Sequence, residues 1–274
     1  MTKVLPKDLT SYDFLKTLAV LLMVIDHIGY HFFPDEMWFR VLGRLSFPIW
    51  FFFVGHARST ELSPRLWGGI AILVASSLIA GQYLLPVTAL LTILISRYLR
   101  HGIVIRSLHS PQALRGMFLI LFFAGFPTGI LFEYGTMGML FVLMGYIMRH
   151  YEEVKKDIEE KYLLLFAGAS FFVFYVTQGM TLTTATLSQA GVMFLGFSVL
   201  FYWLWNFRAK TYPDLTKKLP RVLIVPLQIM GRYTLEIYVA HLVLFRAIAM
   251  NIDFKRFGFL DWEIAPAGMI STFM

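Results

Sequence analysis

Apolar runs separated by short polar stretches recur along the whole sequence. A helix needs about 20 mostly apolar residues to cross the hydrocarbon core of a bilayer, and many of these runs approach that length. We therefore predict about nine membrane-spanning helices, within a range of roughly eight to ten. They lie at residues 14–33, 38–54, 66–79, 83–95, 114–132, 135–148, 162–178, 187–205 and 232–250. The short apolar segment 222–230, which Pro226 interrupts, is interpreted as an interfacial lead-in that could instead extend the last span.

The composition indicates that lipid surrounds this fold. Of the 274 residues, 58% are hydrophobic and only 15% are charged, whereas soluble domains carry about 25% charged residues. The longest charged connections, 149–161 and 208–221, are too short to bury a core of their own. The sequence therefore predicts one all-α domain over residues 1–274, a polytopic helical bundle in the lipid bilayer.

The distribution of basic residues predicts the orientation of the bundle. Cytoplasmic loops of membrane proteins carry an excess of lysine and arginine, and with nine spans most of the 24 such residues fall on the side of the N-terminus. The other side and the membrane keep only Arg40, Arg44, Arg232, Arg246, Lys255 and Arg256. We expect a bacterial inner-membrane protein with a cytoplasmic N-terminus and a periplasmic or extracellular C-terminus. The net charge of +7 then encodes topology, and no nucleic-acid partner is expected.

Ionisable side chains interrupt the first predicted span. An ionisable group in the bilayer costs several kcal/mol unless it meets a partner or a wet cavity, so such residues suggest function. Lys16 and His27 are eleven positions apart, which is close to three helical turns, so they share one face and lie about 16 Å apart along the axis. His31 continues this stripe one turn further. His27 by itself could instead be a hydrogen-bonded histidine of the core.

The second span carries Arg44 at a depth close to that of Asp26 and His27. The connection between the first two spans is short, so the helices should be antiparallel neighbours. We predict that Arg44 pairs with Asp26. A buried pair of this kind can also be a simple clamp between helices, and that alternative stays open. Arg58 follows the cytoplasmic end of the span, where it could anchor the helix at the interface or contact an anionic ligand.

The last span, within GRYTLEIYVAHLVLF, adds further polar groups. Tyr238 and His241 share a face at i,i+3 spacing. Glu236 lies nearer the cytoplasmic end, and its carboxylate could instead be hydrogen-bonded to neighbouring helices. The remaining histidines lack the paired spacing of a metal site, so no metal is expected. The sequence has no cysteine, which excludes disulfides and a thioester relay through the protein.

Several segments resemble one protein family. LKTLAVLLMVIDHIGYHFF and the following WFRVLGRLSFPIWFFFVGHA resemble the opening of the TraX family, which acetylates the amino terminus of conjugative pilin. YGTMGMLFVLMGYIMRH and YTLEIYVAHLVL are similar to later segments of that family in the same order. The spacing of Lys16 and His27 and the final Tyr-x-x-His are also similar to wider relatives, the type 3 and heparan glucosaminide acetyltransferase-like membrane acyltransferases. The resemblance implies one transmembrane acyltransferase-like domain.

The resemblance and the polar residues together suggest a mechanism. Acetyl-CoA would bind from the cytoplasm with its phosphates near Lys16 and Arg58, and His27 would act as general base on an acceptor. Asp26 and Arg44 would fix this site electrostatically, and His241 would serve as a second acid or base or orient the oxyanion. The further residues expected to bind the acceptor are Tyr238 and Glu236. Whether transfer is direct or passes through acetyl-His27 stays open.

The acceptor implied by the closest resemblance is the N-terminal amine of a pilin subunit or another component of the cell envelope. Two other functions remain alternatives. An O-acetyltransferase acting on an envelope glycan would need the same groups. A proton-coupled transporter would also bury Asp, His and Arg, but it would usually show repeat symmetry, which the sequence lacks.

Cysteine labelling tests the predicted orientation, since the sequence supplies no cysteine of its own. Single cysteines in 149–161 and 208–221 should react with a membrane-impermeant thiol reagent only from the cytoplasmic side. A cysteine near Lys255 should react only from outside. External labelling at position 156 would refute the orientation.

Overall fold

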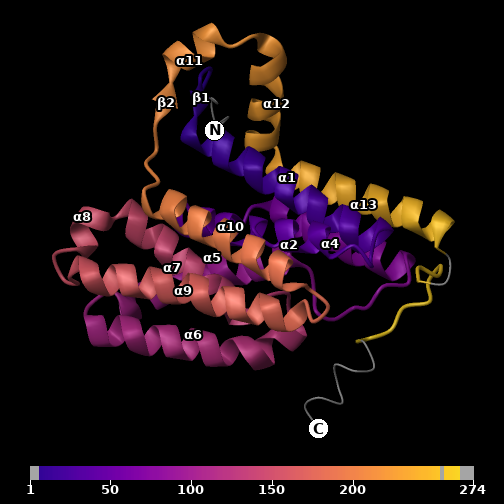
Figure 1. Ribbon diagram of the computed structural model, residues 1–274, viewed down its shortest axis with the longest axis horizontal. Coiled ribbons are helices and arrows are strands. Elements are labelled where there is room, and N and C mark those ends of the chain that lie inside the picture. Colours follow the sequence, from indigo (N-terminus) through magenta and orange to yellow (C-terminus); the bar gives the residue numbers. More distant parts are fainter. Residues whose placement is uncertain (1–5, 254–255, 266–274) are drawn as a thin grey trace.

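The computed structural model describes residues 6–253 and 256–265, and helices make up most of this length (Figure 1). Lys3 and Lys255, which the charge distribution used, lie outside the described residues. The helices of the first half are α1 (Ser11–Phe32), α2 (Met37–Gly43), α3 (Ser46–His56), α4 (Pro64–Ile79), α5 (Ala89–Ser107) and α6 (Pro111–Leu131). The 3-10 helix η1 (Gly135–Met137) leads into α7 (Gly138–Arg149), α8 (Tyr151–Val154), α9 (Glu160–Thr181), α10 (Leu187–Trp205), α11 (Pro213–Lys218), α12 (Arg221–Arg232) and α13 (Thr234–Ile252).

The predicted all-α membrane fold is confirmed. Six helical segments of the described chain are long and apolar enough to cross a membrane: α1, α2 with α3, α6, α9, α10 and α13. Two shorter apolar helical segments, Pro64–Ile79 and Gly135–Arg149, occupy the predicted third and sixth spans. These lengths do not establish the exact number of nine.

The predicted fourth span, 83–95, is partly wrong. The chain is not helical between residues 83 and 88, and α5 begins only at Ala89. Pro86 lies in the non-helical part and has no N–H to donate within a helix. The helix then continues to Ser107, well beyond the predicted end, and carries Arg97 and Arg100.

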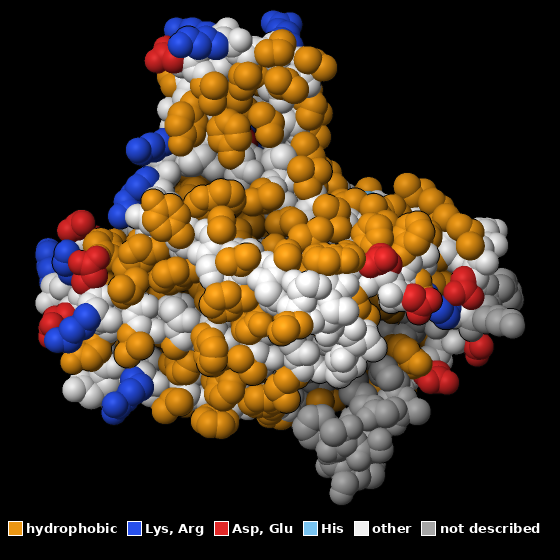
Figure 2. All heavy atoms as spheres, viewed as in Figure 1, with side chains coloured by type: hydrophobic (Ala, Val, Ile, Leu, Met, Phe, Trp, Pro, Cys, Tyr) orange, Lys and Arg blue, Asp and Glu red, His pale blue; other side chains and the backbone are white. Residues whose placement is uncertain are grey.

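The bundle has two parts that meet along α1. Figure 1 shows α6, α7, α9 and α10 stacked with their axes in a similar direction, while α1 and α13 lie together above the stack in this view. Helix α12 runs across the direction of the stacked helices. On the face drawn in Figure 2, apolar side chains cover the flanks of the molecule and charged side chains gather toward its ends. This distribution is the one expected of a protein whose flanks contact lipid.

The start of α1 is fixed by local hydrogen bonds and by the chain that precedes α12. Thr10 and Asp13 form a capping box at the N-terminus of α1. The two-residue strands β1 (Leu9–Thr10) and β2 (Thr211–Tyr212) pair antiparallel beside it. Asp13 also accepts from Nε of Arg232 at 3.1 Å. The beginnings of α1 and α13 are therefore held at the same end of the molecule.

Segment 222–230 forms most of a separate helix, α12, which contains Pro226 and ends before α13 begins. Its apolar side chains Val222, Leu223, Val225 and Ile229 are exposed. Together with its direction in Figure 1, this exposure supports the interpretation of an interfacial segment.

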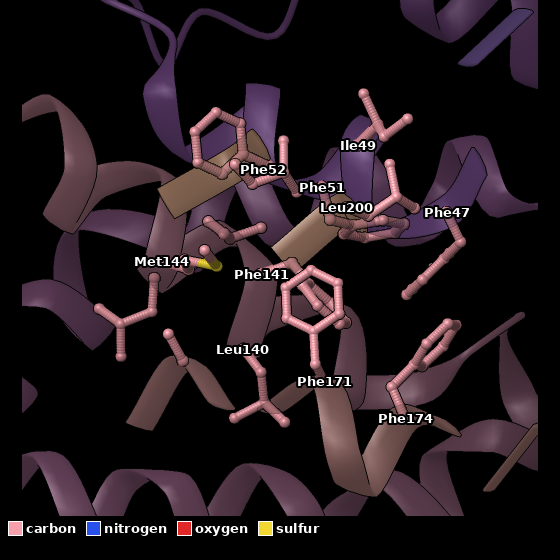
Figure 3. Close-up of a cluster of buried hydrophobic side chains, with 14 of the residues drawn as sticks. Phe47, Ile49, Phe51, Phe52, Leu140, Phe141, Met144, Phe171, Phe174 and Leu200 are labelled. Atoms are coloured by element: carbon pink, nitrogen blue, oxygen red, sulfur yellow. The ribbon is translucent and has the colours of Figure 1, made fainter. Parts of the chain in front are cut away.

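Helices α3 and α7 pack closely, because a glycine on each helix faces the backbone of the other. A Cβ atom at Gly145 would overlap the carbonyl oxygen of Phe52, and one at Gly55 would overlap that of Val142. Small residues at such crossings let membrane helices approach closely. The cluster in Figure 3 surrounds this crossing, with aromatic rings from three helices: Phe47, Phe51 and Phe52 of α3, Phe141 of α7, and Phe171 and Phe174 of α9.

Two arginines satisfy the carbonyl groups at the C-terminus of α3. Nη1 of Arg100 donates to the carbonyls of Val54 at 2.9 Å and Ala57 at 2.8 Å. Nη1 of Arg149 donates to the carbonyl of His56 at 2.7 Å. The last carbonyls of a helix lack partners within it and carry the negative end of its dipole. Cations from α5 and α7 therefore stabilise this end of α3.

Gly145→Ala should destabilise the bundle, because the new methyl group would meet the backbone of α3. Overpacking of a core typically costs about 1–3 kcal/mol. The matched control is Gly168→Ala in α9, where a Cβ would meet nothing within 4 Å. Thermal unfolding in detergent should show a lower Tm for Gly145→Ala alone. Equal Tm values for both variants would contradict the close crossing of α3 and α7.

Candidate active site

A cavity of about 1740 Å³ connects most of the predicted site residues. It is lined by residues of α1, α3, α4, α5 and α13 and by the segment between α4 and α5. The predicted site residues along its wall are Lys16, Asp26, His27, Arg44, Arg58 and Tyr238. Its wall thus includes residues from the start of α1 as well as from its middle.

The histidines of α1 and α13 are in direct contact. Nδ1 of His27 lies 2.7 Å from Nε2 of His241, and the two rings are stacked with centroids 4.9 Å apart. Nδ1 of His241 lies 2.6 Å from the carbonyl oxygen of Ile237. The sequence placed both histidines at similar depth, and the structure brings them together.

These contacts define the neutral tautomers of the pair. A carbonyl only accepts, so Nδ1 of His241 carries its proton and Nε2 of that ring is the acceptor. His27 must then donate from Nδ1, which leaves the lone pair on its Nε2. Within the described residues this nitrogen makes no hydrogen bond, and His27 lines the cavity. The pair therefore presents a basic nitrogen with a fixed ring orientation.

The predicted contact between Asp26 and Arg44 is wrong, because Arg40 takes that place. Nη1 of Arg40 lies 2.6 Å from Oδ2 of Asp26 and also donates to the carbonyl of Asp26 at 3.2 Å. The reason lies in the rotation of the helices. Gly43 packs directly against Asp26, and Arg40 lies three residues earlier on the same helical face. Arg44, one residue after Gly43, is rotated by about 100°.

Arg44 instead contacts the turn before η1. Its Nη1 donates to the hydroxyl of Tyr134 at 2.7 Å, and the Tyr134 ring packs on Phe47 with centroids 3.8 Å apart. Tyr134 has a φ of 66°, an uncommon conformation for a residue with a side chain. Such backbone conformations are retained where surrounding contacts hold them, often at functional sites.

Glu133 completes this side of the cavity, although its position in an outer turn gave no sequence signal beyond a solvated carboxylate. Its Oε2 accepts from the backbone N–H of Ala89 at 2.9 Å. Burial raises the pKa of the Glu133 carboxyl, and the Arg44 guanidinium and the Ala89 N–H oppose that rise. Sequence reasoning missed Glu133 because it lies between two apolar runs. It passed over Arg40 because depth within the second span favoured Arg44 and gave no information on helix rotation.

The start of α1 supplies the other end of the cavity. Lys16 lies over the rings of Tyr12 and Phe53, with its Nζ 5.9 Å and 5.5 Å from their centroids. Arg58 lines the same end of the cavity just beyond α3. Lys16 and His27 therefore border one continuous space, as their shared helical face predicts.

The two residues of α13 predicted to bind an acceptor have different surroundings. The Tyr238 ring lies 5.8 Å from the rings of both His27 and His241 and lines the cavity. Glu236 is exposed at its carboxylate and lies 3.8 Å from Nη1 of Arg65. Glu236 is absent from the cavity wall. Among the described residues, no group of three or more His, Cys, Asp or Glu side chains could hold a metal ion.

Comparison with known proteins identifies similar sequences. A family model described as "TraX protein" matches residues 11–249. The "Uncharacterized protein RP591" of Rickettsia prowazekii (strain Madrid E) is 28% identical over 156 residues, which cover 54% of this chain and 60% of that protein. The match therefore spans less than two thirds of this relative. No solved structure matches the chain.

A double-mutant cycle tests the ion pair between Asp26 and Arg40. Asp26→Ala and Arg40→Ala should each destabilise the protein by up to about 3–5 kcal/mol, because each leaves a charge without its partner. The double variant should lose less than the sum of the two, by roughly 0.5–3 kcal/mol. Unfolding by denaturant in mixed micelles measures these values. The matched cycle of Asp26 with Arg44 should show a smaller coupling energy. A larger coupling energy for Asp26 with Arg44 than for Asp26 with Arg40 would instead support the pairing of Asp26 with Arg44.

Proposed function

Since the chain belongs to the TraX protein family, we propose that it is a membrane-embedded acetyltransferase. In this proposal it transfers the acetyl group of cytoplasmic acetyl-CoA to an acceptor at the outer side of the bacterial inner membrane. The acceptor is the N-terminal amine of a pilin subunit. The observation that carries the proposal is the hydrogen-bonded pair of His27 and His241 beside a cavity that also reaches Lys16 and Arg58.

His27 is the general base in this proposal. The acceptor amine attacks the carbonyl carbon of the thioester, and its proton passes to Nε2 of His27 while the carbon–sulfur bond breaks. The same proton then neutralises the departing thiolate of CoA. His241 holds the His27 ring in the tautomer that leaves Nε2 unprotonated, and it shares the positive charge that develops.

Lys16 and Arg58 bind the phosphates of the donor at the cytoplasmic end. Phosphates are favourable partners for an ammonium and a guanidinium group. The start of α1 brings Lys16 to the cavity, and the chain just beyond α3 brings Arg58. Binding sites for small molecules usually enclose about 300–1,000 Å³. A cavity of about 1740 Å³ has room for the donor arm and the first residues of an acceptor together.

The charged groups around Asp26 keep this site in a fixed geometry. Asp26 with Arg40, and Arg44 with Tyr134, tie α1, α2 and the turn before η1 to one another. Tyr238 lies against both histidine rings and can contact the acceptor. Fixed dipoles and charges of this kind stabilise a developing oxyanion without reorganising. Glu236 has no part in this arrangement, because its carboxylate lies outside the cavity wall.

The alternatives share much of this chemistry. An O-acetyltransferase would use the same base on a glycan hydroxyl. Transfer through an acetyl-His27 intermediate would require Nε2 of His27 itself to attack the thioester. Both leave the role of His27 central. A proton-coupled transporter would use the histidine pair for proton transfer alone and would transfer no acetyl group.

His27→Ala should abolish acetyl transfer while the protein stays folded and inserted, since removing a neutral imidazole leaves no charge unpaired. A general base typically contributes about 10²–10⁴-fold to the rate. The assay follows labelled acetyl-CoA and an acceptor peptide with purified protein in liposomes. The matched control is His101→Ala, which removes an exposed histidine of α5. Turnover of His27→Ala close to that of the control would exclude His27 as the base.

Intact-mass analysis of surface pilin from cells with and without the gene identifies the acceptor. Loss of one acetyl group from pilin in the deletion strain is expected. Unchanged pilin together with acetyl transfer in liposomes would direct the search to an envelope glycan.

A further inference from the structure

Arg246 is a buried arginine of α13 whose hydrogen-bond partners are all neutral. The residue is 7% exposed, and it lines the cavity. Its Nη1 donates to the carbonyl of Leu73 at 2.9 Å and to the hydroxyl of Ser76, both in α4. Its Nε is buried and has no hydrogen-bond partner. Within the described ranges, 6–253 and 256–265, no carboxylate forms a salt bridge with Arg246.

Other buried arginines have closer charge compensation than Arg246, which lies within electrostatic reach of the Glu133 carboxylate but forms no salt bridge with it. Arg40 pairs with Asp26, and Arg232 pairs with Asp13. Arg44 is within electrostatic reach of both Asp26 and Glu133. Arg100 bonds carbonyls at the end of α3, where the helix dipole is negative. The carbonyl of Leu73 lies inside α4, six residues before the helix ends at Ile79, so it offers no comparable negative charge.

The position of Arg246 sets it apart from the donor end of the cavity. Asp13 at the start of α1 pairs with Arg232, the last residue of α12 and two residues before α13, and α1 meets α13 at His27 and His241. Arg246 lies five residues beyond His241, about 7.5 Å further along α13. The histidine pair therefore lies between Arg246 and the Lys16 end. An anion held by Arg246 lies on the far side of the histidines from the donor phosphates.

A second unpartnered polar atom faces the same region. Nδ1 of His31 bonds to the carbonyl of His27 at 2.9 Å, and Nε2 of His31 is buried without a partner. His31 lines the cavity, and Arg246 lies within electrostatic reach of His31, His27 and Tyr238. Buried polar atoms without partners are costly, and a ligand that hydrogen-bonds to them removes that cost.

We propose that Arg246 binds a carboxylate of the acceptor and so selects acceptors with an acidic group close to the acetylated amine. This proposal rests on the proposed acetyltransferase function. A guanidinium group matches the planar geometry of a carboxylate and can donate two parallel hydrogen bonds to it. Bound in this way, the acidic group orients the acceptor while its amine lies at Nε2 of His27. Arg246 is thus a specificity-determining residue on the acceptor side.

Matched acceptor peptides test this specificity. Each pair of peptides has a free N-terminal amine and differs only in Asp or Asn at one of the positions two to five. Wild-type protein should acetylate the best Asp peptide with a KM about tenfold or more below that of its Asn partner, because hydrogen bonds to charged groups contribute that much. Arg246→Gln should raise the KM for the Asp peptide to the value for the Asn peptide, with kcat nearly unchanged.

The controls separate recognition from stability. Arg246→Lys keeps the positive charge but cannot donate two parallel hydrogen bonds to a carboxylate. Its KM for the Asp peptide should therefore lie between those of wild type and Arg246→Gln. Arg106→Gln, which removes an exposed arginine of α5, should keep the wild-type preference. If Arg246→Gln does not fold, the preference of wild-type protein and its reduction in Arg246→Lys still decide the matter. Equal KM values for Asp and Asn peptides with wild-type protein would overturn the proposal.

Two further outcomes would also overturn it. If Arg246→Gln lowers kcat equally for both peptides and leaves KM unchanged, Arg246 acts on the reaction itself. If detergent-purified Arg246→Gln binds less phosphatidylglycerol from mixed micelles than wild type and keeps the peptide preference, its ligand is a lipid phosphate. Should wild-type protein acetylate no peptide, the proposed function fails, and equilibrium dialysis with the same peptides and no acetyl-CoA then tests Arg246 separately. Tighter binding of the Asp peptide, lost in Arg246→Gln, would still support the carboxylate site.

Discussion

The cost of a charge inside a membrane bundle governs how this structure is organised. A buried ion in low dielectric must meet an opposite charge or a set of polar atoms, and most of the buried cations here meet one of the two. Arg40 meets Asp26, Arg44 meets Tyr134, and Arg100 meets the carbonyls at the end of α3. Each contact joins two elements that are separate in the sequence. The charged groups therefore fix which helices are neighbours, while the apolar side chains supply most of the packing.

The close crossing of α3 and α7 holds in place the elements that carry these charged contacts. Gly55 and Gly145 bring the two backbones together, and the surrounding phenylalanines fill the space beside them. Helix α3 also carries the chain from Arg44, near the histidines, to His56 and Arg58 at the Lys16 end. Rigid packing on one side of α3 leaves the polar cavity on its other side, against α1. A site held by a rigid scaffold keeps its geometry without help from a ligand.

The sequence predicts the helices far better than the contacts between them. Apolar length places α1, α6, α9, α10 and α13 closely, and the spacing of Lys16 and His27 correctly places both on one cavity. Depth also brings His241 to the level of His27. Depth alone, however, says nothing about the rotation of a helix, and Arg40 and Arg44 differ mainly in rotation. The helix that carries Gly43 against Asp26 turns Arg40 toward the carboxylate, and only the packed structure contains that information. Nothing in the sequence singles out Arg246. The count of basic residues on each side of the membrane used every arginine only to predict orientation.

Several polar atoms of residues that line the cavity have no hydrogen-bond partner. At Asp26 and Arg40 the chain supplies both charges of the ion pair, although Oδ1 of Asp26 has no hydrogen-bond partner. The basic nitrogen of His27, Nε2 of His31 and Nε of Arg246 have no hydrogen-bond partner in the described chain, and all three residues line one cavity. A protein that only needed its helices clamped would gain stability by satisfying these atoms internally. Under the proposed function, the acceptor is what these atoms meet, because they border the cavity next to the histidine pair.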